Sequence, residues 1–551
     1  MSIPRPKTIR NTAEMNGPGA PAPASDSATS YDELPYTVLS HYFTHPDRLA
    51  TAGALFGLTP QPVENCRVLE LGCASGGNLI PMAYALPGSQ FVGIDLSSAQ
   101  IEQGQAYLRM LKLANIDLVR QDLLDFAPGP AGFDYVLVHG VFSWVPPRAQ
   151  EQVFEICRQC LSANGVAYIS YNVLPGWTME QALRQMMLFH IRQETRPMER
   201  FRKAVELLDF LAKEASATDD EAHREHLRKT IQRMRKHADA NYPYWIHEYL
   251  EEINTPFYFS QVVEMAGRHG LQYLADSDLP TLYTNDLSEE SGRFLEQNAQ
   301  DWVEREQYLD FLRNRMFRRS LFCRQEAVLT RQPGLEQLRH LNVVSRILPV
   351  DREVSTANDD PMVFEVPQEA ILTFHDPVQK TALAYLAEQL PRPVPFAELA
   401  QATRSRLSRA STQAVQETSA EEIARVLFKI HSSYPSLVNF NTWVPPSTRA
   451  VSERPTASAA ARLLAATGSP ITSLVHRRVE LEEHNRCLLG YLNGERSQAE
   501  LVDLLDAGWR EGKIPLPYLK AGSDPQTTLE AIARQVTLQL DDFARLDLLI
   551  A

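Results

Sequence analysis

The sequence has little cysteine, no net positive charge and no long apolar run. Six cysteines in 551 residues show no disulfide-type spacing, and the single C-x-x-C pair, Cys157 and Cys160, falls in a predicted helix without a second pair of ligands. We therefore predict helix packing for this pair and no metal site. Because a membrane helix needs about 18 or more apolar residues in a row and no signal peptide is visible, we expect a cytoplasmic protein without membrane insertion.

The charge balance excludes one large class of partners. The chain carries 54 basic and 68 acidic residues, for a formal net charge of −14. A general nucleic-acid binder is basic, so no nucleic-acid partner is predicted. The length predicts two or three domains. Residues 1–30 are rich in Pro, Ala, Ser and Gly, and we expect a disordered tail there.

One stretch near the N-terminus organises the rest of the chain. A predicted buried strand at 67–71 ends in the small residues 72–77, a predicted helix covers 78–86, and a second strand at 90–94 ends at Asp95. This is the first half of a doubly wound nucleotide-binding sheet. Small residues allow a ligand to approach the backbone, and Asp95 is placed to accept hydrogen bonds from both hydroxyls of a ribose.

The glycine pattern bears on which nucleotide is bound. A dinucleotide fingerprint would read Gly72, Ala74 and Gly77, so the second glycine, which admits a pyrophosphate, is missing. Together with Glu70, this favours a ligand without phosphates, although an NAD or FAD Rossmann domain is the alternative. The segments E-L-G-C-A-S-G-G and G-I-D-L-S resemble the class I S-adenosylmethionine-dependent methyltransferases. The resemblance implies S-adenosylmethionine as cofactor and the following cofactor-binding residues: Glu70, Gly72, Ala74, Gly76, Asp95, Leu96, Asp122, Leu123, His139 and Gly140.

The remaining strand patterns complete the sheet of this class. Further strands are predicted at 116–120, 133–139, 166–171, 271–275 and 318–324. We therefore expect an α/β fold with a seven-stranded Rossmann-like sheet, forming a methyltransferase domain over residues 31–330. A charged helical stretch at about 178–256 is predicted to be an insertion over the mouth of the site.

Several residues at the predicted strand ends are candidates for chemistry. Methyl transfer to an amine needs a neutral nucleophile, so a general base and an apolar, aromatic mouth are expected. His139 and Tyr171 are the candidate general bases. The candidate substrate-binding residues are Tyr36, Trp144, Asn172 and Trp177. Plain packing is the alternative for each of them.

Other segments are similar to one bacterial methyltransferase family. They are 31–36, 44–50, 69–74, 171–177, 247–251 and 306–312. That family carries a methyltransferase regulatory domain and includes the rickettsial protein-lysine methyltransferases that modify outer-membrane proteins. The resemblance implies a protein-lysine N-methyltransferase with a protein substrate, such as an outer-membrane protein, and leaves a homodimer open. The alternatives are a small-molecule N- or O-methyltransferase whose extra domains gate the pocket, and a non-catalytic S-adenosylmethionine sensor.

The C-terminal part shows an internal repeat. Residues 421–425 echo 530–534, and 384–386 echo 490–492, each within a pattern of three helices and a short apolar tail. After a linker at 331–366, we therefore expect a mostly helical region, 367–551, of tandem winged-helix-like units. Basic residues are sparse on the expected recognition helices, so these units are predicted to contact protein rather than DNA.

Overall fold

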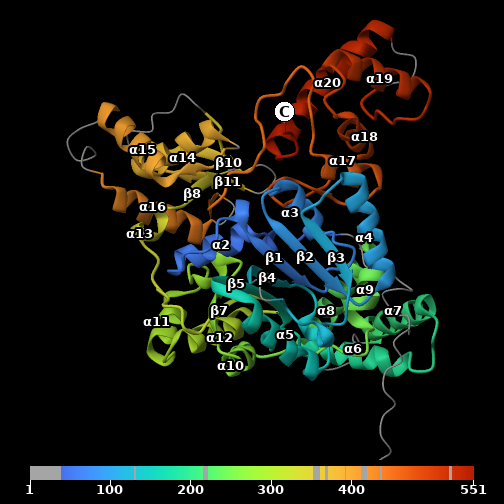
Figure 1. The fold of residues 1–551 in the computed structure, drawn as a ribbon, viewed down its shortest axis with the longest axis vertical. Helices are drawn as coiled ribbons and strands as arrows, with labels where there is room; N and C mark the ends of the chain where they lie inside the picture. The colour runs from blue at the N-terminus through green and yellow to red at the C-terminus, as the bar shows by residue number, and fades with distance from the viewer. Residues whose placement is uncertain are drawn as a thin grey trace, which may run out of the picture.

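The computed structural model describes most of the chain (Figure 1). The described residues are 39–129, 132–214, 221–345, 347–351, 360–366, 370–390, 392–410, 418–434, 437–519 and 524–550. The predicted tail and Tyr36 lie outside them. None of the described helices is both long and apolar enough to cross a bilayer.

A seven-stranded sheet forms the centre of the molecule, as predicted (Figure 1). Its strand order is β3-β2-β1-β4-β5-β7-β6, and β7 runs antiparallel to both of its neighbours. The strands are β1 (Arg67–Leu71), β2 (Gln90–Asp95), β3 (Ile116–Arg120), β4 (Phe133–Val138), β5 (Leu161–Asn172), β6 (Leu271–Asp276) and β7 (Phe317–Arg324). Their predicted positions differ from these mainly at β5, which begins five residues earlier than expected.

Helices cover both faces of the sheet because its inner strands are apolar on both sides. One face, which includes Val68, Leu137 and Tyr168, packs against α2 (Pro46–Leu55), α3 (Leu79–Ala85) and α4 (Ser98–Leu111). The other face, which includes Leu69 and Val136, packs against α5 (Pro147–Cys160), α10 (Phe259–Arg268) and α12 (Trp302–Arg313). Ser97 caps α4 by accepting from the backbone of Gln100, as its position before the helix predicts.

The expected helical insertion follows β5 and has a core of its own. It consists of α6 (Thr178–His190), α7 (Pro197–Glu214), α8 (Glu221–Ala240) and α9 (Tyr242–Tyr249). Leu183, Met187, Leu208 and Trp245 are buried between these helices. A further helix, α11 (Glu289–Asn298), lies between β6 and α12 in the chain.

We expected a linker at 331–366, and the described residues of this range form a helix and three strands instead. They contain α13 (Leu335–Leu338), β8 (Asn342–Ser345), β9 (Leu348–Pro349) and β10 (Met362–Val366). β8 is the middle strand of a sheet between β12 (Val394–Pro395) and β13 (Val438–Asn441), and β10 pairs with β9 and with β11 (Ala370–Phe374). The buried Val343 of β8 pairs with residues far along the chain, so the local sequence gave little sign of this strand.

The repeat corresponds to equivalent helices of two C-terminal units. The first unit has α14 (Pro377–Gln389), α15 (Phe396–Ala410) and α16 (Ala420–Ser433); the second has α17 (Ala459–Ala466), α18 (Glu483–Tyr491), α19 (Gln498–Arg510) and α20 (Pro525–Arg545) with a hairpin of β14 (Ile471–Thr472) and β15 (Arg478–Val479). The repeated segments lie at α14 and α18 and at α16 and α20. Figure 1 shows the two units side by side above the central sheet.

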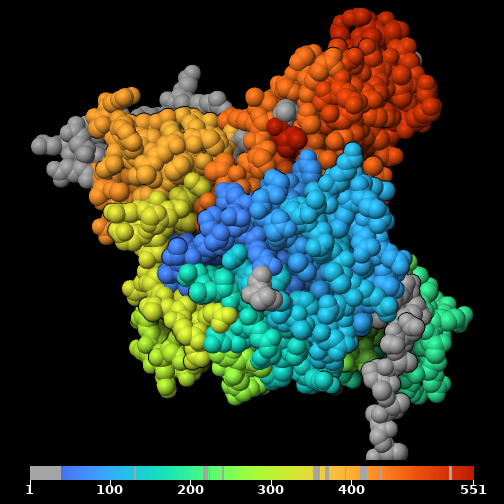
Figure 2. All heavy atoms as spheres, in the orientation of Figure 1, coloured from blue at the N-terminus to red at the C-terminus, as the bar shows by residue number. Residues whose placement is uncertain are grey.

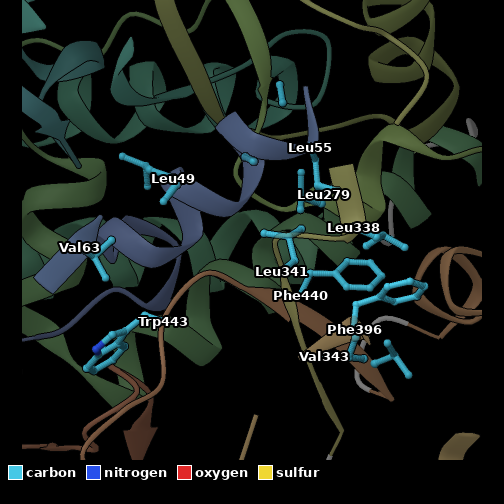
Figure 3. Packing of buried hydrophobic residues seen from close by; sticks show 14 of the residues in the cluster. Leu49, Leu55, Val63, Leu279, Leu338, Leu341, Val343, Phe396, Phe440 and Trp443 are labelled. Carbon is cyan, nitrogen blue, oxygen red and sulfur yellow. The ribbon is translucent and has the colours of Figure 1, made fainter. Parts of the chain in front are cut away.

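The two units join the sheet domain in different ways. The first shares its apolar core, since Leu49 and Leu55 of α2 belong to one buried cluster with Val343 and Phe440 (Figure 3). The second has a separate core and meets the sheet domain through α17 and the β14–β15 hairpin. In the space-filling view this second unit rests on the residues around α3 and α4 (Figure 2).

Candidate functional site

The loop after β1 wraps around the carboxylate of Asp95. Asp95 accepts from the backbone N–H of Ala74 at 2.8 Å and of Ser97 at 2.9 Å. Gly72 and Gly76 have φ angles of +76° and +74°, which L side chains rarely adopt, so glycine is needed at both turns. The loop therefore holds the end of β2 beside the end of β1, with Asp95 fixed at the junction.

Glu70, at the end of β1, is a buried carboxyl with one oxygen unused. The amide nitrogen of Asn78 donates to Oε1 at 2.7 Å, whereas Oε2 is buried and has no hydrogen-bond partner among the described residues. Burial raises the pKa of Glu70 to about 8, against the Asn78 hydrogen bond and with a further contribution from Asp95. A buried carboxyl with a spare acceptor is suited to an incoming ammonium group.

The neighbouring strand ends leave space for a flat ligand. A Cβ atom added to Gly140, after β4, would meet no atom within 4 Å. Leu96, directly after Asp95, is 49% exposed although it is apolar, and Leu123 after β3 is half-buried. Asp122 accepts from the backbone of Leu124 at 2.8 Å, which orders the turn η3 (Leu123–Asp125). The predicted cofactor-binding residues thus gather along one edge of the sheet, where ligands bind in open α/β folds.

A pair of histidines lies beside this edge. Nδ1 of His139 is 2.9 Å from the hydroxyl of Tyr168 and 3.3 Å from that of Ser170, which accepts from the backbone N–H of Gly140. The ring of His41, from the segment before β1, lies over that of His139 with 3.7 Å between centroids. The four side chains join the end of β4, the middle of β5 and the N-terminal segment.

Both imidazoles are held neutral. Burial, followed by Arg478 and Arg319, lowers the pKa of His41 to about 4. Burial, followed by His41 and Arg319, places the pKa of His139 well below its ordinary value. A neutral imidazole keeps one ring nitrogen as an acceptor, so either ring can accept a hydrogen bond from a proton donor at neutral pH.

Comparison with known protein families matches three parts of this chain. A methyltransferase domain matches residues 69–167, a predicted methyltransferase regulatory domain matches 241–324, and the C-terminal winged helix domain of PKMT matches 453–548. The uncharacterized protein RP789 of Rickettsia prowazekii is 30% identical over 519 residues, which are 93% of this chain and 91% of that protein. This chain belongs to the same family of S-adenosylmethionine-dependent methyltransferases.

Solved structures agree with this assignment. PKMT2 from Rickettsia typhi in complex with AdoHcy superimposes with a TM-score of 0.82 at 28% identity and covers 94% of this chain and 100% of that chain. A second relative, RP028 of Rickettsia prowazekii, is 38% identical over 245 residues, which are 44% of this chain and 96% of that protein. The methyltransferase therefore uses S-adenosylmethionine, and the fold class predicted from the sequence is confirmed.

Tyr171 does not lie where the methyltransferase could use it as a base. Its hydroxyl is 2.8 Å from Oγ of Ser320, and its ring packs near Phe142 and Phe257 on the α5 face of the sheet. His139 meets β5 at Tyr168 and Ser170, and side chains alternate along a strand, so Tyr171 points to the opposite face. The tyrosine beside His139 is Tyr168, which the alternation of β5 could have indicated.

The three predicted substrate-binding residues that the structure describes lie in different surroundings in the methyltransferase. Trp177 is buried against Tyr249, with 6.1 Å between ring centroids, in the core of the helical insertion. Asn172 is buried and its amide donates to Asn254 at 3.2 Å. Trp144 is half-buried in the turn η4 (Phe142–Trp144) after β4, and Tyr36 lies outside the described residues. Trp144 alone of these four is described at a partly open position near the sheet edge.

The sequence did not point to Asn78, although it connects several parts of the site. Its Oδ1 lies 3.0 Å from the backbone nitrogen of His41, 3.0 Å from Oγ1 of Thr44 and 2.8 Å from Nε2 of His476. His476 comes from the second C-terminal unit, 398 residues away along the chain. No local sequence pattern predicts the contact between Asn78 and His476.

Proposed function

We propose that this methyltransferase transfers methyl groups to lysine side chains of a protein substrate. The observation that carries the proposal is the extent of the similarity to PKMT2, which covers the whole of that chain, and the winged-helix match at 453–548. Proteins that share only the cofactor-binding sheet can act on unrelated acceptors. A shared arrangement that includes the insertion and the C-terminal units supports the acceptor implied by the name PKMT, protein-lysine methyltransferase.

The cofactor-binding roles follow from the groups at the sheet edge. Oε2 of Glu70 is free to accept from the ammonium of the methionine moiety, and Asp95 is placed at the end of β2 to accept from the ribose. Leu96 and Leu123 offer apolar surface to the adenine, with Asp122 nearby to accept from its amino group. Gly72, Ala74, Gly76 and Gly140 keep the backbone accessible. When bound, S-adenosylmethionine supplies the electrophilic methyl group on its sulfonium.

The acceptor nitrogen must be neutral before it can attack the methyl carbon. The reference pKa of lysine is about 10.4, so the ammonium has to lose a proton at the mouth of the site. Arg319, which lowers the pKa of both His41 and His139, also disfavours the charged form of an amine placed beside them. His139, which lies beside Tyr168 and Ser170, is the group that we assign to accept this proton, and the lowered pKa of its ring makes the transfer transient, with water as the final acceptor.

The division of the chain belongs to the same proposal. Residues up to about 330 form the methyltransferase domain, 331–441 the first C-terminal unit and 453–548 the second. The C-terminal units then dock the protein substrate. All six cysteines are free thiols, which supports action in the reducing cytoplasm.

The test is to follow where the methyl group goes. Purified protein and methyl-labelled S-adenosylmethionine are incubated with a bacterial lysate divided by size into protein and small-molecule fractions. Label in protein bands, absent with the Asp95→Ala variant, is the expected result. Label in the small-molecule fraction alone contradicts the proposal and supports a small-molecule methyltransferase. Cofactor binding without transfer to either fraction contradicts it in favour of a sensor.

A further inference from the structure

The β14–β15 hairpin of the second C-terminal unit reaches the edge of the methyltransferase sheet. Thr472 Oγ1 is 2.9 Å from Oγ of Ser40, and His476 Nε2 is 2.8 Å from Oδ1 of Asn78. His476 lies at the turn of the hairpin with a φ angle of +62°, and its side chain is buried. The hairpin therefore places the side chain of His476 against Asn78, which directly follows the loop of residues 72–77 after β1.

The hydrogen bonds of Asn78 fix which way its amide points. The backbone N–H of His41 can only donate, so the atom of Asn78 that faces it must be the oxygen. His476 faces the same oxygen, so its Nε2 must carry the proton. The amide nitrogen of Asn78 is thereby directed to Oε1 of Glu70.

These hydrogen bonds connect the second C-terminal unit both to Glu70 and to the pair of His41 and His139. Through Asn78, His476 acts on the orientation of Glu70, whose other oxygen faces the cofactor side in the proposed roles. The same oxygen of Asn78 receives the N–H of His41, whose ring stacks on His139. Without His476, the oxygen of Asn78 loses the nearest of the three groups that face it and keeps the His41 and Thr44 contacts, so the amide is held less firmly toward Glu70.

We propose that His476 is a positioning residue through which docking of the second C-terminal unit sets the affinity of the methyltransferase for S-adenosylmethionine. It touches neither cofactor nor acceptor and acts through Asn78 and Glu70. The inference rests on the cofactor role proposed for Glu70. By linkage, cofactor binding strengthens docking of the unit by the same factor as docking strengthens cofactor binding.

The test compares two substitutions at His476 in the full-length protein. Asparagine tolerates the left-handed backbone at position 476, but in His476→Asn the side-chain nitrogen is one bond closer to Cα and does not reach Asn78. In His476→Gln the side-chain nitrogen is as many bonds from Cα as Nε2 of histidine and can still donate to Asn78. Titration calorimetry with S-adenosylmethionine is expected to show an about ten-fold weaker Kd for His476→Asn. His476→Gln is expected to bind within about three-fold of the wild type. In transfer assays in which the cofactor concentration is varied, the KM for the cofactor of His476→Asn rises, while kcat at saturating cofactor changes much less.

A control variant separates positioning from docking alone. Thr472→Val removes the other buried hydrogen bond of the same hairpin without touching Asn78. It is expected to lower the melting temperature while leaving the Kd within about two-fold. A Thr472→Val protein that binds as weakly as His476→Asn overturns the inference, because docking then suffices.

The Glu70→Gln variant distinguishes failure of this inference from failure of the assigned cofactor site. Weak binding by Glu70→Gln together with wild-type binding by folded His476→Asn overturns the inference alone. Wild-type binding by both variants overturns the role assigned to Glu70 as well.

Discussion

The rings of His41 and His139 are in contact, with 3.7 Å between their centroids and a tilt of 37°, although one precedes the first strand of the sheet and the other follows the fourth. The pair lies close to the loop after β1, since the backbone of His41 donates to Asn78 at the start of α3. Burial and nearby cationic groups lower the pKa of both rings, so the pair offers neutral hydrogen-bond acceptors beside the sheet edge. The first prediction concerns this pair.

Replacing His139 by glutamine is expected to lower kcat about 100-fold, because general-base catalysis contributes about that much or more. The Kd for S-adenosylmethionine stays within about three-fold, since the groups proposed to bind it are unchanged. Single-turnover transfer to the labelled acceptor fraction measures the first quantity and calorimetry the second. An unchanged kcat contradicts the role of His139, and a parallel loss of binding would show that the substitution damaged the cofactor site instead.

Asp95→Asn tests the ribose-binding end of the site. The amide can accept through only one of the two atoms that face Ala74 and Ser97, and it carries no charge for the ribose hydroxyls. Cofactor affinity is expected to fall about 10- to 100-fold, which corresponds to one lost hydrogen bond to a charged group. The matched control is Asp125→Asn at the neighbouring strand end, where the side chain is exposed and binding is expected to be unaffected.

Tyr171→Phe is expected to leave catalysis almost intact. The hydroxyl of Tyr171 bonds Ser320 on the face of the sheet opposite to His139, so its loss costs about 1 kcal/mol of stability and less than two-fold in kcat. Urea unfolding and the transfer assay measure the two effects. If kcat drops with stability unchanged, the tyrosine has a chemical role that its position does not explain.

His45 gives a prediction about pH. Burial, with Arg48, lowers the pKa of His45 to about 3, while the unfolded value is about 6.5. Below pH 6.5, His45 therefore becomes protonated in the unfolded chain but stays neutral in the folded protein. The free energy of unfolding falls as the pH decreases. Relative to His45→Asn, the wild type is expected to lose about 2 kcal/mol between pH 7 and pH 5.

Asparagine is a suitable replacement because it preserves the cap of α2 that His45 provides. Asp47, Arg48 and His476, the other titratable or charged groups near this ring, are present in both proteins, so the difference isolates His45. Urea unfolding of both proteins at the two pH values gives the measurement. Parallel pH profiles would contradict the lowered pKa, because they would mean that His45 takes up its proton at the same pH in the folded and unfolded states.

The central sheet and the cofactor edge were predictable because their signals are local. Strands β1 and β3 begin and end at the predicted residues. The small residues after β1 predict a turn, and Gly72 and Gly76 have the positive φ angles that favour glycine there. The position of Asp95 at the end of β2 was predictable for the same reason, and its role toward the ribose stays a prediction. Short apolar runs bounded by turns predict buried strands from the local sequence alone, and distant contacts are not needed for the prediction.

The differences from the prediction have two sources, the alternation of side chains along a strand and contacts between distant segments. Tyr171 was chosen because it is aromatic and near the strand end, although the period of the strand directs Tyr168 to His139 instead. Trp177 fills the core of the insertion, which its position in the chain could not reveal. Strand β8 pairs with β12 and β13 much later in the chain, and His476 contacts Asn78 although the two residues are 398 positions apart.

The central claim, methyl transfer to protein lysines, is tested most directly by mapping the product. Labelled proteins from the transfer reaction are digested and analysed by mass spectrometry, with Asp95→Ala processed in parallel. The account predicts methylated lysines that appear with the wild type and are absent with the variant. Methyl groups on carboxylates, on other side chains or on small molecules only would contradict it.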